Sequence, residues 1–296
     1  MNKNHSFVGS NVALITPMFD DGSVDYESLN NLIDFHIDAG TSSIVSVGTT
    51  GESATVGVKE HLKILDHTIK YAARRIPIIA GTGANSTSEA IELTQEAKNF
   101  GADACLLVTP YYNKPTQEGL FQHFKLIAER VSIDQILYNV PGRTAVDMSV
   151  DTTSRLSEIS NIIGIKDATG DLSVIKELVA KCPEDFLLLT GDDATAIDFL
   201  LLGGHGGISV TANVTPKELQ KAYLAAIAGN AEVAKKFNEA LSCLHKNLVI
   251  ESNPIPVKWA LHKMGKCDNG IRLPLLELSN ECKTVLENDL KELNLI

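Results

Sequence analysis

Lys166 is the residue of this sequence with the clearest capacity for chemistry. It stands in Ile162-Ile163-Gly164-Ile165-Lys166-Asp167-Ala168, at the carboxyl end of an apolar run that is typical of a buried parallel strand. Burying a charged amine costs several kcal/mol unless a partner compensates the charge. Loss of the proton relieves that cost, and the neutral amine is a nucleophile toward carbonyl carbon. The alternative is a lysine that has left the strand and pairs with Asp167, and the segment alone leaves both interpretations open.

Other reactive side chains also follow apolar runs. Together they comprise an amine, three phenols, two adjacent hydroxyls, a guanidinium and several glycines, at Lys166, Tyr111, Tyr112, Tyr138, Thr49, Thr50, Arg143, Gly191 and 203–207. This set suits carbonyl chemistry on a small carboxylated substrate. The amine forms a Schiff base, a phenol relays protons, and hydroxyls with amide N–H groups hold a carboxylate. A guanidinium binds a second carboxylate through two parallel hydrogen bonds.

Most of these residues also have an ordinary structural interpretation. Tyr138 could be a core aromatic with a satisfied hydroxyl, and the two threonines could be strand residues or a helix cap. The glycines at 203–207 could cradle a phosphate or form a tight turn. The segment 81–83 lacks the third glycine of a dinucleotide-binding loop, which argues against such a site.

The elements that must position these residues alternate regularly. Short runs rich in Val, Ile and Leu recur at 12–15, 43–47, 76–80, 104–108, 135–138, 162–165, 186–189 and 207–210. Amphipathic stretches lie between them; the one at 25–37 places Leu29, Leu32, Ile33 and His36 on one face. Continuous apolar runs indicate strands that are buried on both faces. We therefore expect a closed (β/α)8 barrel, which carries its chemistry at the carboxyl ends of the strands.

The barrel is expected to occupy residues 1–225, and the remainder of the chain contains no further strand pattern. Helices are predicted at 231–249, 256–264 and 275–293. Residues 226–296 are therefore interpreted as a helical appendage that packs on the barrel or on a neighbouring subunit.

Composition excludes several classes of function. The net charge of −11, without a local basic run, argues against binding nucleic acid or an anionic membrane surface. No run approaches the roughly 18 apolar residues of a membrane span, and residues 1–7 lack the apolar stretch of a signal peptide. Five scattered cysteines without C-x-x-C spacing suit reduced thiols. A cytoplasmic protein is expected, and the dispersed histidines predict neither a metal site nor a cofactor.

Several of these segments resemble a known family. Gly48-Thr49-Thr50-Gly51-Glu52, Tyr138-Asn139-Val140-Pro141 and 164–170 are similar to the pyruvate-dependent class I aldolases, which include N-acetylneuraminate lyase and dihydrodipicolinate synthase. Four further segments, at 111–115, 141–144, 208–213 and 253–258, most resemble the 4-hydroxy-tetrahydrodipicolinate synthase (dihydrodipicolinate synthase) family of lysine and diaminopimelate biosynthesis. The likeness runs from about residue 9 to about residue 274.

The resemblance implies a lyase that condenses pyruvate with L-aspartate-4-semialdehyde, in a homotetramer built as a dimer of dimers. Lys166 would form the imine with pyruvate, and Tyr138 would relay protons. Thr49 would link Tyr138 to Tyr112 of a neighbouring subunit. The remaining substrate contacts implied are Thr50 to the pyruvate carboxylate, Arg143 to the semialdehyde carboxylate, and Gly191 and Ile208 lining the pocket.

The resemblance also implies a site for L-lysine as a feedback inhibitor. The matching positions are Ser53, Ala54, His61, Asn85, Glu89 and Tyr111. Val58 stands where many sensitive members of the family carry a polar side chain, so we expect weakened inhibition.

Two alternatives stay open at the level of the sequence. One is a sibling aldolase acting on a sialic acid or a 2-keto-3-deoxy sugar acid. Arg143 argues against it, because a polyol chain needs hydroxyl partners rather than a cation. The other is a non-catalytic barrel that senses a keto acid, and the presence of both Lys166 and Tyr138 disfavours it.

Overall fold

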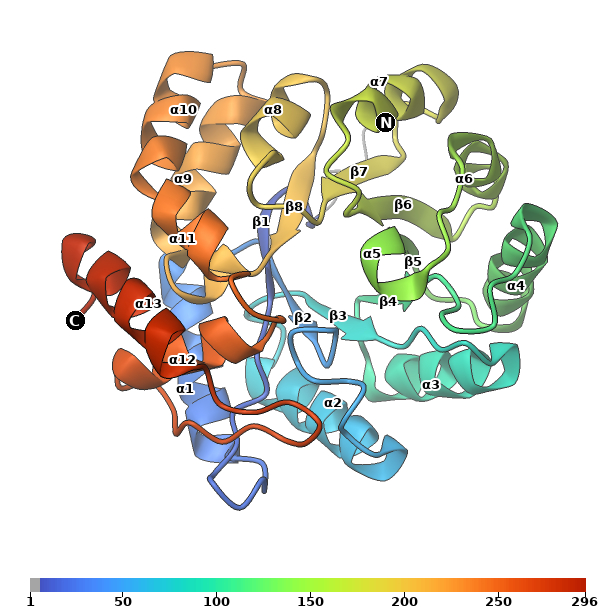
Figure 1. The fold of residues 1–296 in the computed structure, drawn as a ribbon. Coiled ribbons are helices and arrows are strands. Elements are labelled where there is room, and N and C mark those ends of the chain that lie inside the picture. Colours follow the sequence, from blue (N-terminus) through green and yellow to red (C-terminus); the bar gives the residue numbers. More distant parts are fainter. Residues whose placement is uncertain (1–5) are drawn as a thin grey trace.

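The computed structural model describes residues 6–296, and its centre is a closed barrel of parallel strands (Figure 1). Each strand pairs with the next along the chain, and the last pairs with the first. The predicted (β/α)8 barrel is therefore confirmed. The strands are β1 (Gly9–Ala13), β2 (Ser43–Ser46), β3 (Ile78–Gly81), β4 (Ala104–Val108), β5 (Gln135–Asn139), β6 (Ile162–Asp167), β7 (Leu187–Thr190) and β8 (Gly206–Ser209).

Helices surround the barrel and follow its strands in sequence. They are α1 (Tyr26–Ala39), α2 (Val58–Ala72), α3 (Thr87–Phe100), α4 (Gln117–Arg130), α5 (Pro141–Thr144), α6 (Val150–Ser157), α7 (Leu172–Lys181), α8 (Ala196–Leu201) and α9 (Pro216–Ile227). A short 3-10 helix, η1 (Thr211–Asn213), separates β8 from α9. The first helix shows how local sequence sets the boundaries. Asp25 caps its first turn by accepting hydrogen bonds from two backbone N–H groups, and Gly40 ends it with a φ of 76°.

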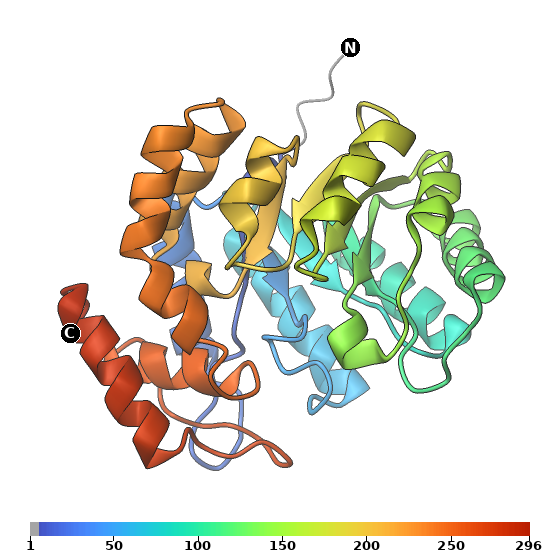
Figure 2. The same ribbon diagram turned by 45° about the horizontal axis from the view of Figure 1, so that its top comes forward.

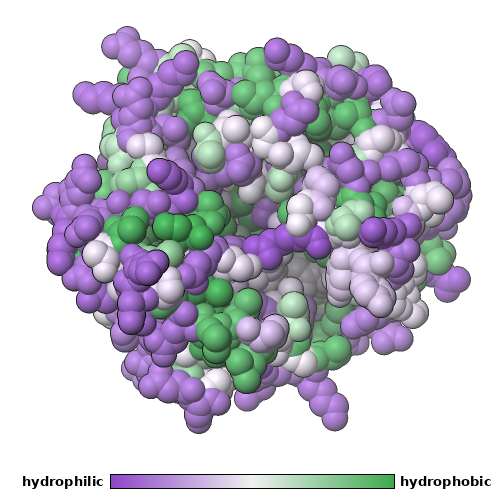
Figure 3. Space-filling view, in the orientation of Figure 1, coloured by the Kyte–Doolittle hydropathy of each residue, from purple (hydrophilic) through white to green (hydrophobic). Residues whose placement is uncertain are grey.

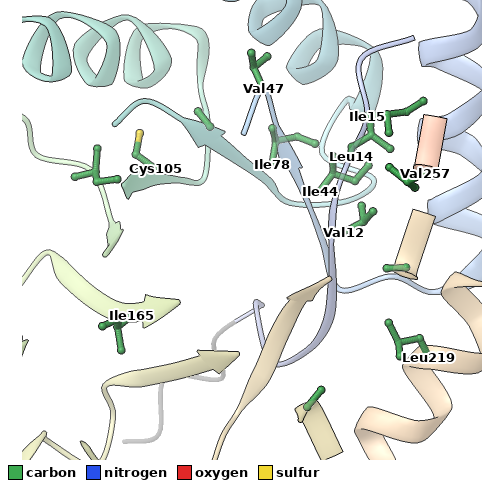
Figure 4. Close-up of a cluster of buried hydrophobic side chains, with 14 of the residues drawn as sticks. Val12, Leu14, Ile15, Ile44, Val47, Ile78, Cys105, Ile165, Leu219 and Val257 are labelled. Atoms are coloured by element: carbon green, nitrogen blue, oxygen red, sulfur yellow. The ribbon is translucent and has the colours of Figure 1, made fainter. Parts of the chain in front are cut away.

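Two hydrophobic layers hold these elements together. One fills the space between the barrel and its helices, and Figure 4 shows part of it, including Val12, Ile44 and Ile165. The other fills the barrel interior and contains alternate strand residues such as Val45 and Ile136. This alternation follows from the two-residue period of a strand, and it determines which strand-end side chains face the barrel axis.

The pairing of β5 with β6 contains an irregularity. Gln135 lies opposite Ile162, but the next residue of β5 lies opposite Gly164, so Ile163 is an extra residue in β6. Such a bulge reverses the faces of all residues that follow it. Ile162 packs in the outer layer, so a regular strand would also have turned Lys166 outward. The bulge instead turns Lys166 toward the barrel interior.

Four helices follow the barrel: α10 (Ala231–Ala240), α11 (Ser242–Asn247), α12 (Ile255–Lys263) and α13 (Asn280–Glu292). Figures 1 and 2 both show α10 beside α9, with α13 farther out. The single helix predicted at 231–249 is wrong, since Leu241 ends α10 and a separate helix, α11, begins at Ser242. The predicted start at 275 is also wrong, because α13 begins after Ser279, whose N–H donates to Glu251. The predicted boundary at residue 225 falls within α9, and the division into 1–225 and 226–296 stays a prediction.

The glycine-rich segment 203–207 and the first residues of the chain differ from the remaining expectations or lie outside the described residues. The segment 203–207 was expected at a carboxyl strand end, but β8 begins at Gly206, so residues 203–205 precede the strand on the opposite side of the barrel from Lys166. Gly203 has a φ of 111° there, as a tight turn requires. The expectation for the first residues of the chain largely concerns 1–5, which are not described. Between residues 6 and 296, no helix is both long enough and apolar enough to cross a membrane.

Candidate active site

Lys166 and Tyr138 lie side by side at the carboxyl end of the barrel. They are direct partners in the register of β6 and β5, and both side chains are buried. The Lys166 Nζ lies 4.4 Å from the centre of the Tyr138 ring. The predicted amine and phenol are therefore neighbours, brought together by strand register and by the bulge in β6.

The Lys166 amine is not paired with its neighbour in sequence. The Asp167 carboxylate accepts hydrogen bonds from the Thr169 backbone at 3.1 Å, from the Thr169 hydroxyl at 2.5 Å and from Asn139 at 3.3 Å. Burial raises the pKa of Asp167 above its ordinary value, and the bonds from Thr169 and Asn139 oppose that shift. Within residues 6–296, the Lys166 Nζ makes neither a hydrogen bond nor an ion pair. The amine is buried and available, as a Schiff-base nucleophile must be.

Gly191 leaves the space that the Lys166 side chain occupies. A Cβ atom at Gly191 would come within 2.6 Å of the Lys166 Cε and 2.8 Å of the Ala168 Cβ. Its backbone N–H donates to the Asp167 carbonyl at 2.6 Å. Gly191 therefore lies beside the amine and lines the cavity that contains it.

A cavity of about 170 Å³ opens above Lys166. Figure 3 shows this face of the molecule, which is hollowed near its centre. Apolar and polar side chains both line the cavity, and they are Ala13, Val45, Gly48, Thr49, Thr50, Leu106, Tyr138, Val140, Arg143, Lys166, Ala168, Gly191, Val210, Val249 and Asn253. Its size suits a small organic acid. Ile208, also predicted to line the pocket, packs in the barrel interior and is not among these lining residues, whereas Val210 is.

Thr49 and Thr50 are placed differently in this cavity. The Thr50 side chain is buried, and its hydroxyl accepts a hydrogen bond from the Asn253 amide at 2.9 Å. Thr49 lines the cavity, but within the described residues its hydroxyl has no hydrogen bond to Tyr138. The predicted hydrogen-bonded chain from Tyr138 to Thr49 is therefore not formed within the described residues of one chain.

Arg143 lies at the mouth of the same cavity. It is carried by α5, the short helix that follows β5, and its guanidinium donates to the Asn253 carbonyl at 3.3 Å. Within the part of the chain that the structure describes, the other N–H groups of this guanidinium have no partner and can bind an anion. Asn253 thus contacts both Thr50 and Arg143, although the sequence pattern predicted no role for it beyond its place in the segment 253–258.

Tyr111 and Tyr112 diverge at the loop after β4. Tyr112 is 91% exposed with a φ of 74°, and it does not reach the cavity above Lys166. Asn85 donates to the Tyr111 carbonyl at 3.2 Å and accepts from Asn113 at 2.8 Å, which fixes the loop. The Tyr112 phenol therefore lies at the surface, outside the cavity above Lys166.

A second cavity of about 430 Å³ adjoins the first. Its lining includes five of the six residues predicted to bind lysine: Ser53, Ala54, His61, Glu89 and Tyr111. The two cavities share Thr49, Val140, Arg143 and Asn253. His61 is buried, and its Nε2 bonds to the Gly81 carbonyl at 2.8 Å. Asn85 holds the Tyr111 loop and does not line this cavity.

Comparison with known proteins decides the family. A model of the dihydrodipicolinate synthetase family matches residues 6–293. The chain belongs to the dihydrodipicolinate synthase family. It is 64% identical over 296 residues to the 4-hydroxy-tetrahydrodipicolinate synthase of Ruthia magnifica subsp. Calyptogena magnifica, with both chains fully covered. The family membership expected from the strand-end motifs is thus confirmed.

Solved structures of the family agree with this assignment. The chloride-inhibited dihydrodipicolinate synthase from Acinetobacter baumannii, complexed with pyruvate, is 56% identical with a TM-score of 0.97, over 98% of this chain and 100% of that one. The enzyme from Cyanidioschyzon merolae with lysine bound is 35% identical with a TM-score of 0.96, over 99% and 100% of the two chains. Similarity therefore extends over the barrel and the C-terminal helices alike.

Proposed function

We propose that this protein is a 4-hydroxy-tetrahydrodipicolinate synthase, a lyase that condenses pyruvate with L-aspartate-4-semialdehyde. The observation that carries the proposal is the Lys166 amine, which has no hydrogen-bond or ion-pair partner within residues 6–296, in a small cavity and 4.4 Å from the centre of the Tyr138 ring. Relatives of this name, at 64% and 58% identity, support the same assignment.

The reaction begins with attack of the Lys166 amine on the pyruvate ketone. Loss of water gives an imine, whose positive charge acidifies the pyruvate methyl group. Tyr138 is the side chain placed to accept and return protons at this carbon. A phenol has a pKa of about 10, so it needs a nearby cation or a hydroxyl relay to act near neutral pH. The iminium of Lys166 and the Thr49 hydroxyl are the groups proposed for that purpose.

The enamine then attacks the aldehyde carbon of the second substrate. Arg143 at the cavity mouth binds the carboxylate of that substrate and points its aldehyde toward the enamine. The substrate amine next attacks the imine carbon, which closes the ring and releases Lys166. A sibling aldolase acting on a sugar acid is less well supported, since the mouth presents a guanidinium where a polyol needs hydroxyl partners.

Borohydride trapping tests the proposal. Pyruvate followed by borohydride should leave a reduced adduct on the intact protein, and peptide mapping should locate it at Lys166. Lys166→Ala should remove it, while Lys176→Ala, on the exposed face of α7, should not. No adduct, or one on another lysine, would refute the mechanism. A panel of aldehydes read by pyruvate consumption then distinguishes the semialdehyde from sugar aldehydes.

We also propose that the cavity of about 430 Å³ takes L-lysine as an effector. The Glu89 carboxylate suits an ammonium group, and the half-exposed Tyr111 ring covers the site. Val58 in the lining supplies no hydrogen bond, so inhibition should be weakened, by a contribution of about 1 kcal/mol. Millimolar L-lysine should inhibit partially, and Glu89→Ala should relieve inhibition with turnover largely kept. Complete insensitivity of the unaltered protein would reject this site.

The remaining expectations are part of the same proposal. They are a homotetramer made of two dimers, a cytoplasmic location, and a catalytic barrel at 1–225 followed by a helical domain at 226–296. The exposed Tyr112 ring and its fixed loop support an interface at that face of the barrel. Size-exclusion chromatography with light scattering measures the assembly directly.

A further inference from the structure

The Thr50 hydroxyl has a defined hydrogen-bonding role in the cavity above Lys166. It is buried and accepts a hydrogen bond from the Asn253 Nδ2 at 2.9 Å. A hydroxyl carries one proton and two acceptor positions, so an oxygen that accepts here keeps its proton for another partner. Thr50 lines the cavity, and the proton is thus available to an acceptor that lies in it.

Asn253 is held in the orientation that this requires. Its backbone carbonyl accepts from Arg143 at 3.3 Å, and its side-chain Oδ1 is buried without a hydrogen-bond partner among the described residues. Turning the amide over would bury Nδ2, with two N–H donors, in the same unpaired position. It would also make Oδ1 the acceptor for the Thr50 proton. The observed orientation leaves only the Oδ1 acceptor without a partner, whereas the reversed one would leave two N–H donors without partners. It also makes the Thr50 hydroxyl a donor toward the cavity.

The segment that carries Asn253 is tied to the loop that carries Thr50. Lys258 of α12 forms an ion pair with Glu52, and both side chains are almost completely buried. The second carboxylate oxygen of Glu52 accepts from the Arg272 backbone and from the Thr55 hydroxyl, each at 3.3 Å. Because both buried charges are paired and the Glu52 carboxylate is further hydrogen-bonded, this contact favours one geometry of the two segments. It therefore helps to hold the segment of Asn253 against the loop of Thr50.

We propose that Asn253 is a positioning residue that makes the Thr50 hydroxyl a hydrogen-bond donor to the carboxylate of the keto acid. The inference rests on the proposed function, since it takes pyruvate as the occupant of the cavity. It gives the C-terminal part of the chain a role in the active site. The Asn253 side chain contacts the Thr50 hydroxyl, and the Lys258–Glu52 ion pair holds the two segments together. A carboxylate at position 253 would reverse the arrangement, because it would accept the Thr50 proton itself.

A double-mutant cycle tests the inference. The variants are Asn253→Asp, Thr50→Val and the two combined, and the measurement is borohydride trapping of pyruvate at increasing concentrations, read by intact mass. Asn253→Asp should raise the half-saturating pyruvate concentration about tenfold or more, as loss of a hydrogen bond to a charged group predicts, with the maximal trapping rate within about threefold. In the Thr50→Val background the same substitution should change half-saturation less than about threefold, because the hydroxyl through which it acts is gone.

The cycle also separates orientation from simple repulsion. The doubly substituted protein keeps the new negative charge, so repulsion of pyruvate would appear undiminished in both backgrounds. Such additivity, or unaltered half-saturation in Asn253→Asp alone, would overturn the inference.

Asn99→Asp on the exposed face of α3 is the matched control for added charge. If thermal melting shows that Asn253→Asp does not fold, Asn253→Ala replaces it, with a smaller effect that should again vanish with Thr50→Val. If the unaltered protein gives no adduct, the proposed function itself fails, and that result is distinct from an additive cycle.

Discussion

At the scale of single residues, the site depends on a missing side chain as much as on reactive ones. Gly191 gives Lys166 its space, since an added Cβ would approach the lysine Cε to 2.6 Å. We expect Gly191→Ala to slow imine formation at least about tenfold by displacing the amine, and to cost about 1–3 kcal/mol of stability through overpacking. Trapping rates and urea unfolding measure the two effects. Gly57→Ala is the control, because a Cβ there meets nothing within 4 Å; equal trapping by both variants would contradict the steric role of Gly191.

Arg143 separates the two half-reactions. Its guanidinium lies at the cavity mouth, away from the buried end of Lys166, so it should bind the second substrate and leave imine formation to other residues. A hydrogen bond to a charged group contributes about 1.5–3 kcal/mol. Arg143→Ala should therefore reduce semialdehyde use at least about tenfold, in kcat/KM, while borohydride trapping of pyruvate stays intact. Equal loss of both steps would make Arg143 a structural residue.

At the scale of elements, the sequence predicts the place of the site better than the direction of its side chains. Apolar runs locate the strands, and parallel strands in a barrel bring their carboxyl ends to one rim, so Lys166, Tyr138 and Thr50 were expected together. The inward direction of Lys166 depends on the extra residue at Ile163, which no periodic pattern reveals because every residue around it is apolar. Gly164 is the one local sign, since a Cβ there would meet the Leu187 backbone oxygen at 2.6 Å. The contact of Asn253 with Thr50 was beyond prediction, because 203 residues separate the two in sequence.

The inner face of α1 carries a group that makes stability depend on pH. His36 is fully buried, and burial, with a smaller effect of Lys266, lowers its pKa to about 3. Between that value and the ordinary pKa of about 6.5, the unfolded chain binds a proton that the folded protein does not. His36 therefore stabilises the fold above about pH 6.5, and this contribution is lost as the pH falls toward 3.

The prediction is a smaller loss of stability in acid for His36→Leu. Its free energy of unfolding should fall less between pH 6.5 and pH 4, by up to about 1.4 kcal/mol for each pH unit, because one proton fewer is taken up on unfolding. Urea titrations at several pH values measure this slope. His67→Gln on α2 serves as the control, since that ring is partly exposed and should change the slope less. Identical slopes in the unaltered protein and His36→Leu would show that His36 does not set the acid limit.

At the scale of the whole molecule, the Tyr112 phenol lies outside the active-site cavity of its own chain. Tyr112 is 91% exposed, its loop is fixed by Asn85 and Asn113, and Thr49 has no hydrogen bond to Tyr138 within the described residues. A second subunit that placed its own Tyr112 near Thr49 would supply the missing member of the proton relay and would bury the exposed ring. Assembly would then be a condition for turnover as well as a source of stability.

Subunit mixing tests this shared site. Tyr112→Phe and Lys166→Ala are each expected to be nearly inactive alone, since one lacks the phenol and the other lacks the amine. In a mixed dimer, one of the two sites combines an intact Lys166 with the intact Tyr112 of the other subunit. Random mixing in equal amounts makes about half of the dimers mixed, so about one quarter of the activity of the unaltered protein should return. Native mass spectrometry confirms that mixed oligomers have formed. If they form and activity does not return, Tyr112 does not act in the site of a neighbouring subunit, and the shared site is rejected.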